Sequence, residues 1–303
     1  MKKLFNGAAP ALFSLLLLSA SFTRPDPKPQ LKGTITYSGT RFLYPLVEKW
    51  AEEFSKAHPG VHFTLSRGTG KVADIEASAA PVKVKDSARG QYTVVSRFVL
   101  VPVINEKNPQ LASLQQKGLS KEDLYRLYFG KESPSGGAQS ASPQAAANPW
   151  APVKVYARGA CASATFSDHF GKKIKDLNNL DASISDDKVL LQKVLSDSLA
   201  LGYNNLGFVY DLRTRKQQQG IRVVPIDLDG NGRIDPKENF YDNLDQLIRR
   251  KEKEPASLPP VGDLTLIYKG ERPEVKAFVE WVRTKGQAYN HAYGFLNPAV
   301  AGR

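Results

Sequence analysis

The chain has 303 residues, of which 42 are Lys or Arg, 30 are Asp or Glu and one is Cys, and its formal net charge is +12. A single cysteine excludes an internal disulfide, and the four histidines do not have the spacing of metal ligands. The positive charges form no basic stripe interleaved with aromatic residues, so we expect no nucleic-acid partner. The sequence contains no G-x-S-x-G, no H-E-x-x-H and no complete P-loop, which disfavours an enzyme.

The first 21 residues have the composition of a secretory signal peptide. Two lysines precede an apolar run from Ala11 to Leu18, which is followed by the small residues Ser19-Ala20-Ser21. The run is too short to span a bilayer, and no cysteine follows it to carry a lipid anchor. We therefore predict residues 1–21 to be a signal peptide and the remainder to be a soluble exported protein.

Residues 31–66 predict a βαβ unit. The β-branched run Leu31–Tyr37 indicates a strand, the polar turn Ser38–Phe42 follows it, and a helix with apolar residues at helical spacing ends at Pro59-Gly60. A second strand, Val61–Ser66, completes the unit. The turn leaves backbone N–H groups at a helix N-terminus, where an anion can bind. An ordinary tight turn before a capped helix is the alternative.

The rest of the chain continues the alternation of strands and helices, which predicts an α/β fold. In chain order we expect a second glycine-containing turn at Ser66–Lys71, a buried strand at Val94–Ile104, a helix from Ser120 to Phe129, a flexible insertion at 133–149, a strand at Val153–Tyr156, a third turn at Arg158–Thr165, a helix at Val189–Val194, a strand-like segment at Gly202–Tyr210, strands at Ile221–Ile226 and Leu264–Tyr268, and a last helix from Pro273.

The segment Pro225–Tyr241 contains a complete calcium-loop pattern. Loop positions 1, 3, 5, 9 and 12 are filled by oxygen side chains and position 7 offers a backbone carbonyl, which gives the candidate ligands Asp227, Asp229, Asn231, Asp235, Glu238 and Arg233. A strand precedes the loop and an apolar helical stripe from Phe240 follows it, so we predict a structural Ca²⁺ site that does not switch a helix pair. A metal-free loop held by Asx turns is the alternative.

Five segments, taken in order, resemble one protein family. They are Gly39–Leu46 with Lys49-Trp50, Asp123–Gly130, Leu201–Leu206, Pro225–Tyr241, and Lys285–Gln287 leading to Tyr293–Leu296. Through these segments the chain resembles the periplasmic phosphate-binding proteins of ABC transporters (PstS-like), as a divergent member, over nearly all of its mature length. The resemblance implies an α/β, two-lobed periplasmic-binding-protein fold (type II) with a hinge and an EF-hand-like strand–loop–helix insertion.

The resemblance also implies the limits of the two lobes. Residues 31–104 plus 258–303 are expected to form lobe 1, residues 105–226 are expected to form lobe 2, and the calcium-like loop and helix at 227–257 are expected to connect them. The strand Leu264–Tyr268 should then pair in the sheet of Leu31–Tyr37 and not with Val153–Tyr156.

Ligand residues follow from the resemblance by position. It implies oxyanion contacts from Gly39, Thr40, Arg41, Phe42, Thr69, Ser78, Arg158, Ser163 and Thr165. Two segments depart from the family, because Ser163-Ala-Thr165 stands where the family has Ser-Gly-Thr, and Ala77–Pro81 lacks a carboxylate at Ala79. Without that proton acceptor, we predict weak discrimination against sulfate and a preference for dianionic phosphate, so that affinity rises with pH.

The resulting functional hypothesis is a periplasmic solute-binding protein, a monomer without catalytic activity. It would capture phosphate or a related oxyanion between its lobes and present it to the permease of an ABC transporter in the inner membrane. A divergent member that binds another oxyanion, or none, is the alternative within the family. An exported calcium-dependent interaction protein, with Asp227–Glu238 as its working part, is the alternative from another class.

Overall fold

The computed structural model describes residues 30–66, 73–80, 90–130, 150, 152–159 and 161–299. The predicted signal peptide, the predicted flexible insertion, and Thr69 with its glycine-containing turn lie outside these residues. From Leu31 onward the chain forms one unit by its contacts. No helix in the described ranges has both the length and the apolar composition that a membrane span requires.

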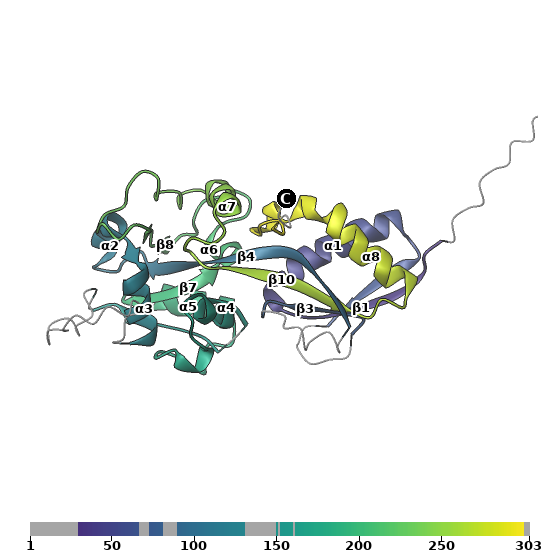
Figure 1. The fold of residues 1–303 in the computed structure, drawn as a ribbon, viewed down its shortest axis with the longest axis horizontal. Helices are drawn as coiled ribbons and strands as arrows, with labels where there is room; N and C mark the ends of the chain where they lie inside the picture. Colours follow the sequence, from purple (N-terminus) through teal and green to yellow (C-terminus); the bar gives the residue numbers. More distant parts are fainter. Residues whose placement is uncertain are drawn as a thin grey trace, which may run out of the picture. The chain divides into compact units, whose positions relative to one another are not determined.

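One mixed sheet organises the protein. Its strand order is β2–β1–β3–β10–β4–β7–β6, and β8 also pairs with β4. The long strand β4 (Gln91–Asn105) pairs with β10 (Val261–Tyr268) over its first part and with β7 (Ala200–Asn205) over its last part. Figure 1 shows β4 and β10 running between two groups of elements, which we call lobe 1, built on β1, β2 and β3, and lobe 2, built on β6, β7 and β8.

Lobe 1 contains the predicted βαβ unit. Its strand β1 pairs in parallel with β2 and with β3, and α1 buries Leu46, Val47, Trp50 and Phe54. A proline lies in the first turn of both α1 and α8, where its missing N–H leaves no acceptor unpaired. The elements are β1 (Gly33–Gly39), η1 (Arg41–Leu43), α1 (Tyr44–Ala57), β2 (Val61–Leu65), β3 (Ile75–Ser78), α8 (Pro273–Thr284), η5 (Gly286–Tyr289) and η6 (His291–Tyr293).

Lobe 2 places short helices around the other end of the sheet. The predicted cap of α3 is present, because the Ser120 hydroxyl accepts from the Asp123 N–H at 3.0 Å and the Asp123 carboxylate accepts from the Ser120 N–H at 3.0 Å. The elements are α2 (Leu111–Lys117), β5 (Leu119–Ser120), α3 (Lys121–Phe129), β6 (Lys154–Val155), α4 (Cys161–His169), η4 (Ile174–Asp176), α5 (Asp187–Ser196), β7, α6 (Leu206–Val209), β8 (Ile221–Val223), β9 (Ile226–Asp227) and α7 (Leu244–Lys253).

The pairing of β10 agrees with the sequence prediction. Residues Thr265–Tyr268 of β10 pair antiparallel with β3, which in turn pairs with β1, whereas β6 pairs with β7. The residue limits given above for the two lobes stay a prediction.

Four predicted elements differ in detail from the structure. The turn expected at Arg158–Thr165 is shorter, because α4 already begins at Cys161. The segment Gly202–Tyr210 is not one strand, because the β4–β7 pairing ends at Asn205 and the next residues form α6, with the Tyr210 N–H donating to the Leu206 carbonyl at 3.0 Å. The segment Ile221–Ile226 is divided into β8 and β9, which pair with β4 and β5 respectively on either side of Pro225. The helix expected from Phe240 begins only at Leu244, where Asn243 caps it.

Candidate anion-binding site

The end of β1 lies in close contact with β3. Gly39 has a φ of +116°, and a Cβ at this position would collide with the backbone of Ala77, so the approach requires glycine. The Thr40 N–H donates to the Ala77 carbonyl at 3.0 Å, and the Thr40 hydroxyl accepts from the Ala79 N–H at 3.2 Å. Thr40 is buried, and these bonds fix the end of β3 beside the start of α1.

The N-terminus of the first helix offers two backbone donors. The N–H groups of Arg41 and Phe42 have no acceptor among the described residues, whereas the Leu43 N–H already donates to the Thr40 carbonyl. Such free N–H groups and the helix dipole favour an anion. The Phe42 ring packs edge to face on Phe98, with centroids 5.3 Å apart, so Phe42 can contribute to a ligand only through its backbone.

The Arg41 side chain reaches from lobe 1 to lobe 2. Its Nη1 lies 3.3 Å from Asp186 Oδ2, and its Nη2 donates to the Ser185 carbonyl at 3.4 Å. Asp186 also caps α5 by accepting from the Val189 N–H at 3.0 Å. The Arg41 side chain remains 55% exposed, so solvent screens this ion pair.

Arg158 follows β6 and is completely buried. Its Nη2 donates to Asp187 Oδ1 at 2.6 Å and its Nη1 donates to the Tyr203 carbonyl at 3.1 Å, while its Nε is buried without a partner among the described residues. The guanidinium also lies 5.4 Å from the centre of the Tyr203 ring. The positive charge of Arg158, which the resemblance implies as an oxyanion contact, is therefore balanced by a carboxylate.

Asp187, the partner of Arg158, was missed in the sequence. It opens α5, and its Oδ1 also accepts from the Asn205 side-chain amide. Burial raises the pKa of Asp187, and the Arg158 guanidinium and the Asn205 amide act in the opposite direction. A buried arginine needs a counter-charge, but the expected anion could supply it, and sequence distance gives no way to choose among the acids.

The two predicted hydroxyls of α4 have protein partners. Ser163 donates to the Arg158 carbonyl and accepts from the Tyr203 hydroxyl at 2.7 Å. Thr165 donates to the Ala79 carbonyl at 3.4 Å. Ser163 thus holds the turn that carries Arg158, whereas Thr165 extends from lobe 2 to the end of β3.

The structure brings together only part of the predicted set. Thr40 and Thr165, from different lobes, both contact the backbone of Ala79, and Arg41 lies at Asp186. The Ser78 hydroxyl bonds locally to Ala80, with an N···O distance of 3.2 Å. Among the described residues no hydrogen bond or ion pair joins Arg158 to the predicted lobe 1 residues, and Thr69 lies outside the described part.

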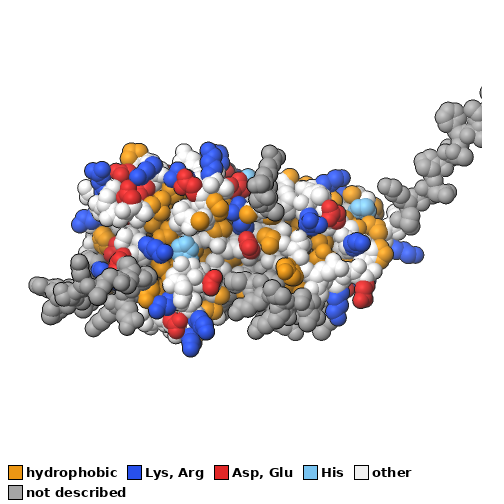
Figure 2. Space-filling view, viewed as in Figure 1, with side chains coloured by type: hydrophobic (Ala, Val, Ile, Leu, Met, Phe, Trp, Pro, Cys, Tyr) orange, Lys and Arg blue, Asp and Glu red, His pale blue; other side chains and the backbone are white. Residues whose placement is uncertain are grey.

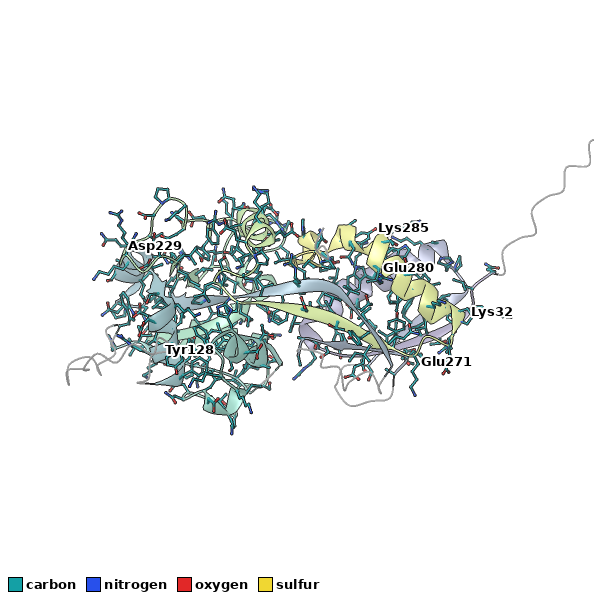
Figure 3. All side chains as sticks on the ribbon, viewed as in Figure 1. Lys32, Tyr128, Asp229, Glu271, Glu280 and Lys285 are labelled. Carbon is teal, nitrogen blue, oxygen red and sulfur yellow. The ribbon has the colours of Figure 1, made fainter. Side chains whose placement is uncertain are left out.

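The calcium-like loop lies elsewhere in lobe 2. Ligand oxygens of Asp227, Asp229 and Glu238 come within 4.8 Å of one another, with Asp227 and Glu238 buried. Figure 3 shows Asp229 in the loop before α7, well separated from Tyr128 on α3, whose ring contacts Tyr203. The donor set fits a hard cation such as Ca²⁺, because three carboxylates converge.

Other hydrogen bonds in this loop fit the metal-free alternative. The Gly230 and Gly232 N–H groups each donate to Asp227 at 2.8 Å, as in Asx turns. The Lys237 ammonium lies 2.9 Å from Asp229, and this hydrogen bond lowers the pKa of Asp229. Of the other predicted ligands, Asn231 donates through its side-chain amide to Asp235 at 3.0 Å, and Arg233 pairs with Asp235 through its guanidinium.

Comparison with known proteins identifies the fold. No protein-family profile and no curated protein sequence matches the chain. A putative phosphate ABC transporter substrate-binding protein from Clostridium perfringens, solved with bound phosphate, is 17% identical with a TM-score of 0.61, and the match covers 88% of this chain and 100% of that one. An ABC-type phosphate transport receptor from Vibrio cholerae is 14% identical with a TM-score of 0.55, again covering 88% and 100%.

The chain has the type II periplasmic-binding-protein fold. The predicted α/β fold class is thereby confirmed, whereas the comparisons do not show the EF-hand-like insertion. The oxidised form of OxyR also matches, at 10% identity and a TM-score of 0.50, over 86% of this chain and 96% of that one. Because OxyR shares this fold with phosphate receptors, the fold alone does not decide the ligand.

Proposed function

We propose that the chain is an exported solute-binding protein that captures phosphate, or a related oxyanion, between its two lobes for the permease of an ABC importer. The observation that carries the proposal is the meeting of Thr40 and Thr165, from different lobes, at Ala79. They meet beside the N–H groups at the start of the first helix, which have no acceptor among the described residues. The phosphate receptors that share the fold support the same ligand class.

The charged residues near the candidate anion-binding site suit a small anion, and no large basic surface is required to attract it. The Arg41 guanidinium is exposed beside Asp186, and Arg158 lies buried in lobe 2 with no partner for its Nε among the described residues. Figure 2 shows Lys and Arg interspersed with Asp and Glu on the face viewed. On this face, recognition by a few fixed donors therefore suits the protein better than attraction of a polyanion.

Calorimetric titration of the mature protein with phosphate and, separately, with sulfate tests the proposal. We expect saturable phosphate binding, weakened in Thr165→Val, which removes a hydroxyl with little change of shape. Thr284→Val is the matched control, because Thr284 is exposed on the last turn of α8. Absence of heat and of thermal stabilisation with both anions would reject an oxyanion-binding role.

The calcium-dependent interaction protein remains a second candidate, and one observation favours it. Three carboxylates converge in the loop and two of them are buried, a donor set that suits a hard cation. We propose a structural Ca²⁺ site at Asp227, Asp229 and Glu238. Thermal stabilisation by Ca²⁺ together with no response to phosphate or sulfate would favour this candidate over the first.

A further inference from the structure

Arg215 has an unusual backbone conformation. Its φ is +63°, and it is the single non-glycine residue with positive φ in the described ranges. A side chain other than glycine, Asn or Asp is strained there, and such strain persists where surrounding contacts over-determine it. Arg215 makes those contacts with α7 and with the C-terminal segment His291–Asn297.

The guanidinium of Arg215 joins these two elements. Its Nη2 donates to Asp245 Oδ1 at 2.7 Å and to the His291 carbonyl at 2.8 Å, and its Nη1 donates to the Ala292 carbonyl at 3.3 Å. The Leu244 N–H donates to the Arg215 carbonyl at 2.9 Å, which fixes the turn to the start of α7. One side chain thus holds the start of α7 and the carbonyls of η6.

Glu252, near the end of α7, holds the same segment at a second place. Its Oε1 lies 2.8 Å from His291 Nε2 and accepts from the Asn297 N–H at 2.9 Å. Beyond these contacts Leu296 is fully buried in the core cluster that contains Leu244, Leu247 and other lobe 2 residues. The segment that follows lobe 1 helix α8 is therefore anchored in lobe 2.

The chain just before this segment remains tied to lobe 1. The Asn290 side-chain amide donates to the Val95 carbonyl at 3.3 Å, and the Trp50 indole of α1 donates to the Gly286 carbonyl at 2.8 Å. Contacts of this segment with α7 and contacts of Arg41 with Asp186 are present together in this structure. The anchored segment thus accompanies the arrangement in which residues of both lobes meet at the candidate site.

We infer that the contacts of Arg215 and Glu252 with His291–Asn297, which we call the C-terminal latch, hold the two lobes in the arrangement that assembles the candidate anion site. The inference rests on the proposed function for its effect on ligand affinity, but its effect on lobe geometry needs no ligand. When only a fraction of molecules has the competent arrangement, the apparent Kd rises by the reciprocal of that fraction.

Distance measurement between spin labels tests the latch directly. Labels at Gln192→Cys on α5 and Lys276→Cys on α8, both exposed, are placed in a Cys161→Ser background and measured without ligand and with phosphate. Arg215→Asn removes the guanidinium but tolerates positive φ. Arg213→Ala is the matched control, since it removes the same charge from an exposed position in the same turn.

We expect Arg215→Asn to broaden or shift the distance distribution without ligand and to weaken phosphate binding several-fold, whereas Arg213→Ala changes neither. Glu252→Gln tests the second anchor independently if Arg215→Asn does not fold. If both variants fold and the distances between the labels do not change, the contacts of Arg215 and Glu252 do not control the arrangement of the lobes and the inference is wrong. A distance shift in a protein that binds neither phosphate nor sulfate would retain the latch and reject the proposed function.

Discussion

Two cations of this protein, Arg158 and Lys251, are both fully buried, but they are compensated in different ways. Arg158 contacts the carboxylate of Asp187 at 2.6 Å. The Lys251 ammonium instead donates to the Glu254 carbonyl at 3.2 Å and to the Ser257 carbonyl and hydroxyl. Arg158 is thus compensated by an opposite charge, and Lys251 is compensated by the dipoles of carbonyl and hydroxyl groups.

This difference shows which buried cation needs a charged partner for the fold to be stable. Burial lowers the pKa of Lys251 to about 7, aided by the nearby cations Arg97 and Arg250 and opposed by the Glu254 carboxylate. Lys251 can therefore lose its proton and remain buried. Arg158 has no such route, because a guanidinium stays protonated, so its folded environment requires Asp187.

Arg158→Ala should give the largest loss of stability. It leaves the Asp187 carboxylate buried without its cation, and breaking a buried pair from one side costs about 3–5 kcal/mol. Urea denaturation monitored by tryptophan fluorescence measures the change. The double variant Arg158→Met, Asp187→Leu should recover most of the loss, because it removes both charges. A cost below about 1 kcal/mol for the single variant would show that Asp187 does not depend on Arg158.

Calcium should produce the next largest effect. It would bind in a loop that buries carboxylates, whereas the two regions compared above bury cations. In this loop the buried carboxylates of Asp227 and Glu238 accept hydrogen bonds from backbone N–H groups, such as the Leu228 N–H at 2.8 Å from Glu238. Free Ca²⁺ at 100 times its Kd should stabilise the fold by about 2.7 kcal/mol, read as a higher melting temperature than in EDTA. Glu238→Gln should remove most of this gain, and Mg²⁺ is the control ion. An unchanged melting temperature would favour the metal-free loop.

Lys251 should make stability depend on pH above neutrality. Its folded pKa lies below the unfolded value of 10.5, so the unfolded state binds more protons between about pH 7 and 10.5 and stability rises with pH there. The slope approaches about 1.4 kcal/mol per pH unit within that window. Denaturation at pH 7.5 and 9 measures it, and Lys251→Met should flatten the dependence. A fall in stability over this range in the parent protein, absent from the variant, would contradict the assigned direction.

The sequence predicted most of the fold because its signals are local. The apolar stripe of α1, the Ser120–Asp123 cap and the strand run of β4 each specify an element without reference to distant residues. The errors occurred where a strand ends because its neighbouring strand ends. At Asn205 the pairing of β7 with β4 stops, and the next residues form α6.

The candidate site was harder to predict for the same reason. The resemblance named Arg158 and Ser163, but the bonds of each to Tyr203, 45 and 40 residues away, depend on tertiary contacts. Asp187 could not be identified as the partner of Arg158, because the sequence gives no distance between the two residues. The free N–H groups of Arg41 and Phe42, in contrast, follow from a helix start and could be expected from the local turn.

The smallest effect concerns the pH dependence of phosphate binding, which depends on the charge balance between Asp187 and Arg158. The sequence predicted affinity that rises through the second ionisation of phosphate, which lies near pH 6 in phosphate esters. Because Asp187 balances Arg158, the additional charge of a dianion is met mainly by Arg41, which is exposed and already lies 3.3 Å from Asp186, and exposed ion pairs contribute about 0.2–1 kcal/mol. We therefore expect affinity to rise by no more than about fivefold between pH 5.5 and 7.5. Calorimetry at the two pH values measures the rise, and Asp187→Asn, if folded, should steepen it because Arg158 loses its counter-charge. Affinity that instead falls as pH rises would mean that a carboxylate of the site accepts a proton from the bound anion, and the predicted preference for the dianion would be wrong.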